Sequence, residues 1–217
     1  MMRPNHALQR TWHNAVVCNS RIPWAGSLRL GRKATLRAMS LPTFKYHPDP
    51  IATGSVKQSD AVCECCGQQR GFIYTGPVYC VEELSECICP WCIADGSAHT
   101  KFDAEFTDSA GIGSHYLTQQ VSPAVVEEVA FRTPGFSGWQ QERWLACCRD
   151  AAAFVGRAGH AELHSRFPDA IESIRTDSEM GERWPHFFEA LSSEDSPTAY
   201  VFRCLHCGTH VGYADYT

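Results

Sequence analysis

Residues 63–67 read Cys-Glu-Cys-Cys-Gly, residues 89–92 read Cys-Pro-Trp-Cys, and 22 residues lie between Cys66 and Cys89. Each motif is a Cys-x-x-Cys turn, which directs two thiolates toward one point, as tetrahedral Zn–S bonds of about 2.3 Å require. Gly67 can adopt a positive φ, so the backbone can turn back toward the sulfur atoms. The separation slightly exceeds the usual zinc-ribbon spacing. We therefore predict one structural Zn²⁺ held by Cys63, Cys66, Cys89 and Cys92.

The same form recurs near the C-terminus, where residues 204–208 read Cys-Leu-His-Cys-Gly. A second ion held by Cys204 and Cys207 needs two further ligands. Two adjacent cysteines cannot easily both bind one tetrahedral ion, so we expect Cys148 and a histidine to complete this site. A knuckle without metal is the alternative, and the sequence favours neither. The remaining candidates are Cys147 for the thiol and His160, His164, His206 and His210 for the fourth ligand.

A redox role is a competing interpretation of Cys89-Pro90-Trp91-Cys92, because thiol-disulfide oxidoreductases carry a similar motif. Such chemistry needs an exposed thiolate of low pKa, typically at a helix N-terminus. No βαβ pattern surrounds residues 70–100, and a matching cysteine pair lies upstream, so metal binding is favoured. Cys65 is expected to point away from the ion. Cys80 and Cys87 are not assigned as ligands, although Cys87 could replace one of the four if the pairing is wrong.

The composition is that of an ordinary globular protein, with 217 residues, 44% hydrophobic and 20% charged. Its apolar stretches are too short to cross a bilayer, which excludes membrane insertion. No continuous apolar signal-peptide segment begins the chain, so we expect reduced thiols in a cytoplasmic protein.

Residues 1–40 carry seven Lys or Arg and no Asp or Glu, whereas residues 41–217 carry 12 basic and 24 acidic residues, a net charge of −12. The acidic body disfavours nucleic acid, whose binding depends on Lys and Arg. We interpret residues 1–40 as a disordered or mis-annotated extension, with the true start near Met39, in preference to a transit peptide. The folded domain is then 41–217.

The local patterns predict an α+β protein: a zinc-knuckle β region, a helical middle segment and a C-terminal knuckle hairpin. Ser122 and Pro123 suit the N-cap and first position of a helix. Trp139, Trp144 and Trp184 are expected in a helical core. The expected strands are 71–75, 198–203 and 209–213, and the expected helices are 124–131, 139–148, 151–155, 168–175 and 185–191.

Several motifs together resemble the CbrC family of small bacterial proteins, one member of which is linked to colicin tolerance. They are 41–50 (LPTFKYHPDP), 71–79 (GFIYTGPVY), 89–97 (CPWCIADGS) and 133–144 (TPGFSGWQQERW), together with the knuckles at 63–67 and 204–208. The resemblance covers about residues 41–217 and implies a cytoplasmic bacterial protein whose cysteine motifs hold zinc. It also implies a second cysteine four positions after Cys148, where this chain has Ala152, so the C-terminal site is expected to be depleted.

Three functions remain open at this point. The first is a non-enzymatic zinc protein that acts through an unknown protein partner in stress or colicin tolerance. The second is an enzyme, either a thiol oxidoreductase or a zinc enzyme with an open metal position. A nucleic-acid-binding zinc ribbon is third. The chain lacks the common catalytic motifs, so we assign no catalytic residues and favour the first function.

Overall fold

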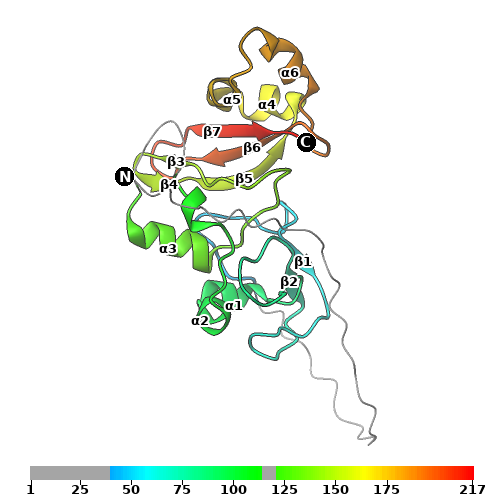
Figure 1. Ribbon diagram of the computed structural model, residues 1–217, viewed down its shortest axis with the longest axis vertical. Coiled ribbons are helices and arrows are strands. Elements are labelled where there is room, and N and C mark those ends of the chain that lie inside the picture. Colours follow the sequence, from blue (N-terminus) through cyan, green and yellow to red (C-terminus); the bar gives the residue numbers. More distant parts are fainter. Residues whose placement is uncertain (1–39, 114–120) are drawn as a thin grey trace, which may run out of the picture.

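The computed structural model describes residues 40–113 and 121–217. Residues 1–39, to which nearly all of the predicted extension belongs, lie outside this part of the chain. The α+β class predicted from the sequence is confirmed, and the described chain forms three regions stacked along the long axis of Figure 1. A small cysteine-rich region lies at one end, a three-stranded sheet in the middle, and a layer of short helices at the other end.

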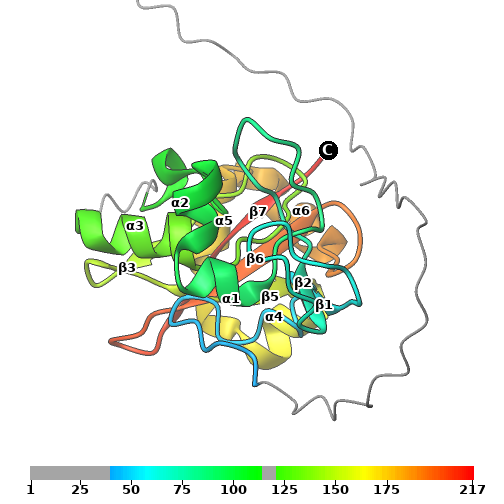
Figure 2. The same cartoon turned by 90° about the horizontal axis from the view of Figure 1, so that it is seen from below.

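The cysteine-rich region contains little regular structure. Strands β1 (Val56–Gln58) and β2 (Phe72–Tyr74) pair antiparallel over three positions, and they are followed by helices α1 (Pro90–Ala94) and α2 (Ser97–Phe102). Figure 2 views the molecule from this end, and α1, β1 and β2 lie in front of the sheet. The core of this region includes buried cysteines beside Ile73, Ile88 and Phe106. Elements this short cannot fold independently, so other interactions must hold the region together.

The central sheet has the strand order β5-β6-β7, with all strands antiparallel. These strands span Ala153–Ala158, Thr198–Arg203 and His210–Asp215. Both faces are covered, so side chains of β6 alternate between two cores. Tyr200 and Phe202 pack in the core on the side of the cysteine-rich region, whereas Ala199 and Val201 pack against the helical layer.

The helical layer is inserted between β5 and β6 in the sequence. The helices expected near 168–175 and 185–191 are confirmed, since α5 and α6 belong to this layer. Its first and last residues are adjacent, because the amide of His160 donates to the carbonyl of Leu191 at 3.0 Å. The elements are α4 (His160–Arg166), η2 (Pro168–Ala170), α5 (Ile171–Ser178), η3 (Gly181–Arg183) and α6 (Trp184–Ala190).

The opposite face of the sheet packs on an aromatic core and on helix α3 (Pro123–Arg132). The predicted cap of α3 is confirmed, because the Ser122 hydroxyl accepts a hydrogen bond from the amide of Val125 at 3.4 Å. Phe136 and Phe154 stack with ring centroids 3.9 Å apart, and Trp144 is fully buried beside them. The short elements η1 (Ser109–Gly111), β3 (Ala146–Cys147) and β4 (Asp150–Ala151) complete this side.

Two predicted helices are wrong. Residues 151–155 contribute to β4 and β5, because this short apolar run is buried between two layers and pairs with β6. Periodicity alone cannot distinguish such a run from a helix. Residues 139–145 form no helix, because the backbone amides of Trp139, Gln140 and Arg143 donate to side chains of the sheet.

The tryptophans also differ from the prediction. Trp144 belongs to the sheet core instead of a helical core, and Trp139 is 40% exposed. Trp184 packs among the helices as expected.

Candidate metal centres

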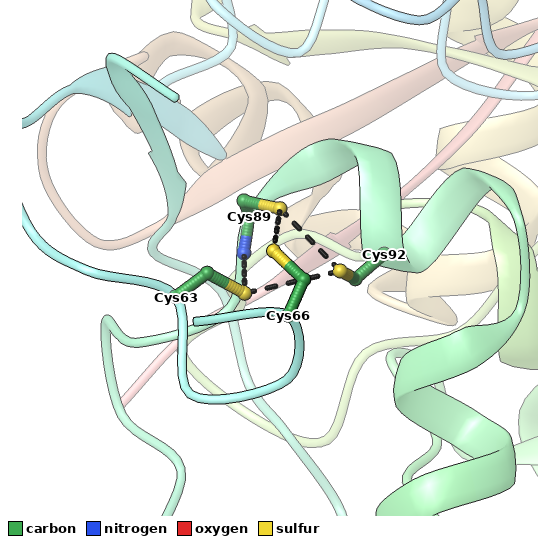
Figure 3. A group of neighbouring side chains, drawn as sticks. All are labelled: Cys63, Cys66, Cys89 and Cys92. Carbon is green, nitrogen blue, oxygen red and sulfur yellow. Dashed lines mark hydrogen bonds between the residues drawn. The ribbon is translucent and has the colours of Figure 1, made fainter. Parts of the chain in front are cut away.

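Cluster A consists of Cys63, Cys66, Cys89 and Cys92, whose sulfur atoms lie within 4.8 Å of one another. Figure 3 shows the four side chains converging from two segments. The first pair lies in the turn between β1 and β2, which closes when the amide of Gly67 donates to the carbonyl of Cys63 at 2.7 Å. Gly67 has φ of 67°, as its position after the knuckle predicts. Cys89 is the N-cap residue of α1, and Pro90 begins that helix.

The spacing of cluster A fits one tetrahedral ion. The Sγ–Sγ distances are 3.9 Å for Cys63–Cys92, 3.9 Å for Cys66–Cys89 and 3.6 Å for Cys89–Cys92. A tetrahedron with Zn–S bonds of about 2.3 Å has edges of about 3.8 Å, whereas a disulfide requires about 2.05 Å. The amide of Cys89 also donates to Cys63 Sγ at 3.3 Å, a contact that stabilises a thiolate ligand.

Electrostatics within cluster A also favour a cation. Hydrogen bonding from Cys89 lowers the pKa of Cys63 to about 4, and the same interaction raises the pKa of Cys89. Burial raises the pKa of Cys92 to about 12. Four thiols at this spacing cannot all ionise unless a positive charge lies among them, and metal ligands must be thiolates. Cluster A could therefore hold a metal ion such as zinc.

Cluster B consists of Cys147, Cys148, Cys204 and Cys207, whose sulfur atoms also lie within 4.8 Å of one another. The first two come from the β3–β4 hairpin, whose turn residues Cys148 and Arg149 have φ of 53° and 63°. Positive φ at both central residues is the signature of a type I′ turn. The other two come from the β6–β7 turn, which the amide of Gly208 closes by donating to the carbonyl of Cys204 at 3.1 Å.

The ligand set of cluster B departs from the expectation. Cys148, Cys204 and Cys207 come together as predicted, but the fourth member is Cys147, and no histidine in residues 40–113 or 121–217 joins them. Cys147 Sγ lies 3.9 Å from Cys148 Sγ and 3.8 Å from Cys207 Sγ, so the hairpin turn lets adjacent cysteines face one point. The set is therefore complete without a cysteine at Ala152, whose carbonyl accepts from the indole of Trp144.

The candidate histidines are engaged elsewhere. His206 Nε2 lies 3.0 Å from Asp150 Oδ2, and His210 Nδ1 lies 3.0 Å from Asp169 Oδ1. His160 and His164 pack edge-on against Phe188. The sequence offered Cys147 only as an alternative to Cys148. No local signal showed that both could face one point, because type I′ turns usually contain Asn-Gly or Asp-Gly, and Cys-Arg gives no such indication.

The two clusters differ in exposure. In cluster A, Cys63, Cys89 and Cys92 are at most 2% exposed, whereas in cluster B only Cys204 is buried. Cys148 and Cys207 of cluster B are exposed to solvent. Hydrogen bonding from Thr209 lowers the pKa of Cys207 to about 6, so its thiolate forms readily near neutral pH.

Asp150 connects the two halves of cluster B. It follows the turn of the β3–β4 hairpin, and its carboxylate accepts hydrogen bonds from Tyr46 at 2.7 Å and from Lys45 at 3.1 Å. Its contact with His206 joins the hairpin to the β6–β7 turn. Burial alone would raise the pKa of Asp150, but these hydrogen bonds hold it below its ordinary value. The Asp150 network thus links the two hairpin turns that carry the thiols of cluster B.

The other described cysteines join neither cluster. Cys65 Sγ lies 3.6 Å from the Ser97 hydroxyl, in line with the prediction that it does not face the ion. Cys80 donates to the carbonyl of Glu82, and Cys87 is buried in the core of the cysteine-rich region. Cys87 is therefore not needed as a substitute ligand.

Comparison with known proteins adds a family to this geometry. Residues 41–216 match the model described as Uncharacterised protein family (UPF0167). The chain belongs to this family. UPF0167 proteins of Mycobacterium bovis and Mycobacterium tuberculosis are each 48% identical over 187 residues, which cover 84% of this chain and 97% of theirs. A UPF0167 protein of Pseudomonas aeruginosa is 44% identical over 177 residues, covering 77% of this chain and 93% of its own. No solved structure matches the chain.

The UPF0167 match includes both clusters, because all eight cysteines lie between residues 41 and 216. The relatives carry no assigned chemistry in their names, so the family adds a bacterial context and no activity. Among the described residues of this UPF0167 protein, no helix has the length and apolar character needed to span a bilayer.

Proposed function

We propose that this chain is a non-enzymatic zinc protein of the CbrC type. In this proposal, clusters A and B each hold one structural Zn²⁺. The protein acts in the bacterial cytoplasm by binding a protein partner. The observation that carries the zinc assignment is the pair of four-thiol clusters, in which neighbouring Sγ atoms lie 3.6–3.9 Å apart. Sites with four cysteine ligands are typical of structural zinc, whereas catalytic zinc usually keeps one position for water.

The enzyme alternatives have less support. A hydrolytic zinc site needs an open position, and each cluster already offers four thiols to one point. A thiol oxidoreductase built on the Cys89–Cys92 motif needs an exposed nucleophile there, but Cys89, at the N-terminus of α1, is 1% exposed and faces three other cysteines. The exposed thiol of Cys207 lies among the four thiols of cluster B. The role in stress or colicin tolerance and the cytoplasmic location rest on the CbrC resemblance, and the partner is proposed from the lack of a catalytic motif.

Metal analysis of the purified full chain tests the zinc assignment. Native mass spectrometry is expected to find two zinc ions per chain, one in Cys204→Ser/Cys207→Ser and one in Cys63→Ser/Cys66→Ser if that variant can be isolated. Cys65→Ser is the matched control, because Cys65 lies beside cluster A but outside it, and it should retain two ions. Fewer than two ions in the wild-type chain after purification with zinc would contradict the two-site proposal, and none would contradict zinc binding altogether.

A further inference from the structure

A cavity of about 580 Å³ lies between the segment Pro77–Tyr79 and the segment Ser137–Glu142. This volume is within the range of small-molecule sites. None of the eight clustered cysteines lines the cavity, so it is separate from the proposed metal centres.

Among the described residues that line the cavity, Glu142 alone is charged, and it is 3% exposed. The Tyr79 hydroxyl lies 2.8 Å and 2.7 Å from its two carboxylate oxygens, so one O–H donor is shared between them. Within the described part of the chain, no Lys, Arg or His forms an ion pair with Glu142. The carboxylate also accepts hydrogen bonds from the backbone of Glu142 and Asp108 and from the Gln141 amide nitrogen at 3.5 Å, all of them neutral donors, while the Asp108 side chain adds a negative charge nearby. A buried carboxylate without a cationic partner is costly, so this position invites a positive charge.

Trp139 supplies a rigid aromatic wall. Its side chain is 40% exposed, yet its indole N–H donates to Thr198 at 2.9 Å and its backbone amide donates to Tyr200 at 3.1 Å. The indole nitrogen is thus already bonded, and the guanidinium carbon of Arg157 lies 6.0 Å from the ring centroid, so this ring already contacts one organic cation of the chain. Aromatic rings attract organic cations through their electron-rich faces. Because the ring is held in place before a ligand arrives, little ordering is needed on binding.

From this juxtaposition we infer that the cavity binds an organic cation, a guanidinium or primary ammonium group on an aliphatic stem, with Glu142 as its counter-ion and Trp139 as its aromatic wall. At the same place the side-chain amide nitrogen of Gln141 donates to the Tyr79 hydroxyl at 3.0 Å, so the acceptors open to a bound cation are the carboxylate oxygens of Glu142. A neutral sugar could stack on Trp139, but it would leave the charge of Glu142 uncompensated. An anion would be repelled. This inference goes beyond the zinc assignment and does not depend on it.

Titration of the full chain with agmatine, n-butylammonium and neutral n-butanol tests the site. The readout is the indole N–H signal of Trp139 in heteronuclear NMR, identified by its loss in Trp139→Phe. Both cations should shift this signal saturably, with dissociation constants of about 1 mM or lower, and n-butanol should not. Glu142→Gln preserves the shape of the side chain and should weaken binding by about tenfold or more. Glu189→Gln, an exposed change on α6 with the same effect on net charge, should bind like the wild type.

Equal shifts by n-butanol and the cations, or equal affinity of Glu142→Gln and the wild type, would overturn the inference. If Glu142→Gln does not fold, Trp139→Leu gives the same test through isothermal calorimetry with agmatine, because that exposed side chain can be removed without opening the core. Unchanged affinity in Trp139→Leu would then refute the aromatic wall. A parallel titration with N-acetyl-arginine amide distinguishes the sources of the cation: binding as tight as agmatine indicates an arginine of a protein partner, and much weaker binding indicates a free amine.

Discussion

Replacing Cys63 by serine should unfold the cysteine-rich region while leaving the sheet intact. Cys63 is fully buried, and it accepts a hydrogen bond from the amide of Cys89 in addition to facing the other thiols of cluster A. Serine removes the sulfur ligand and leaves a hydroxyl that binds zinc poorly. The equivalent change in cluster B, Cys207→Ser, affects an exposed residue at the end of a hairpin and should leave the fold intact.

The magnitude follows from the small size of the region. Residues 56–102 contain two three-residue strands and two helices of five and six residues. A structural zinc ion contributes about 10–16 kcal/mol to folding, whereas a whole domain is stable by about 5–15 kcal/mol. The free energy lost with the ion therefore exceeds the free energy of unfolding that a region of this size can have. The sheet keeps six-residue strands and an aromatic core of its own, so it should persist.

Hydrogen exchange measured by mass spectrometry distinguishes the two regions. In Cys63→Ser, amides of residues 56–102 should exchange at least a hundredfold faster, while those of β6 keep their protection. Cys65→Ser is the control from the same turn and should exchange like the wild type. Preserved protection of residues 56–102 in Cys63→Ser would refute the claim that metal holds this region together.

Three further predictions concern other parts of the chain. A chelator should remove the ion of cluster B well before that of cluster A, because two thiols of cluster B are exposed. Mass spectrometry can monitor the metal content during chelation, and simultaneous loss of both ions would contradict this prediction. Burial lowers the pKa of His47 to about 4 from an ordinary 6.5. Between these two pH values the imidazole is protonated in the unfolded chain but not in the folded one. The free energy of unfolding should therefore fall by about 2–3 kcal/mol as the pH drops from 7 to 4.5. Urea unfolding of wild type and His47→Gln checks this, and equal pH slopes would refute it. Trp144→Ala should destabilise by about 3–5 kcal/mol in the same assay, whereas Val81→Ala, at a 95% exposed position, should change stability by less than about 0.5 kcal/mol.

Cluster A was predictable from the sequence because all of its information is local. Each Cys-x-x-Cys pair lies within one turn, and Gly67 marks the positive φ that closes the first knuckle. The α3 cap and the C-terminal hairpin were predictable for the same reason. Ser122 and Pro123 begin the helix that directly follows them, and Gly208 adopts the positive φ of the turn that contains it.

Cluster B was only partly predictable, because its geometry depends on strand pairing. The contribution of Cys147 requires the β3–β4 hairpin, and that hairpin has no turn signature in the sequence. The segment 139–155 was misassigned for a related reason. The backbone amides of Trp139, Gln140 and Arg143 donate to side chains about 60 to 75 positions away, and β5 pairs with β6, so no window of local sequence contains these partners.

The position of the helical layer within the sheet connection has a consequence for how this architecture can vary. Cys147 and Cys207 are 60 positions apart, yet their sulfur atoms are 3.8 Å apart, so α4, η2, α5, η3 and α6 all lie inside one loop whose ends meet at cluster B. Cross-linking a loop of that length lowers the conformational entropy of the unfolded chain. This loss stabilises the folded state by about 4 kcal/mol, whatever the loop contains. Because the layer begins and ends at adjacent backbone positions, its length can change without separating β5 from β6, provided that the sheet face bearing Ala199 and Val201 stays covered. Shorter or foreign inserts between β5 and β6 should be accommodated, and circular permutation should be tolerated within this layer more readily than at either metal centre.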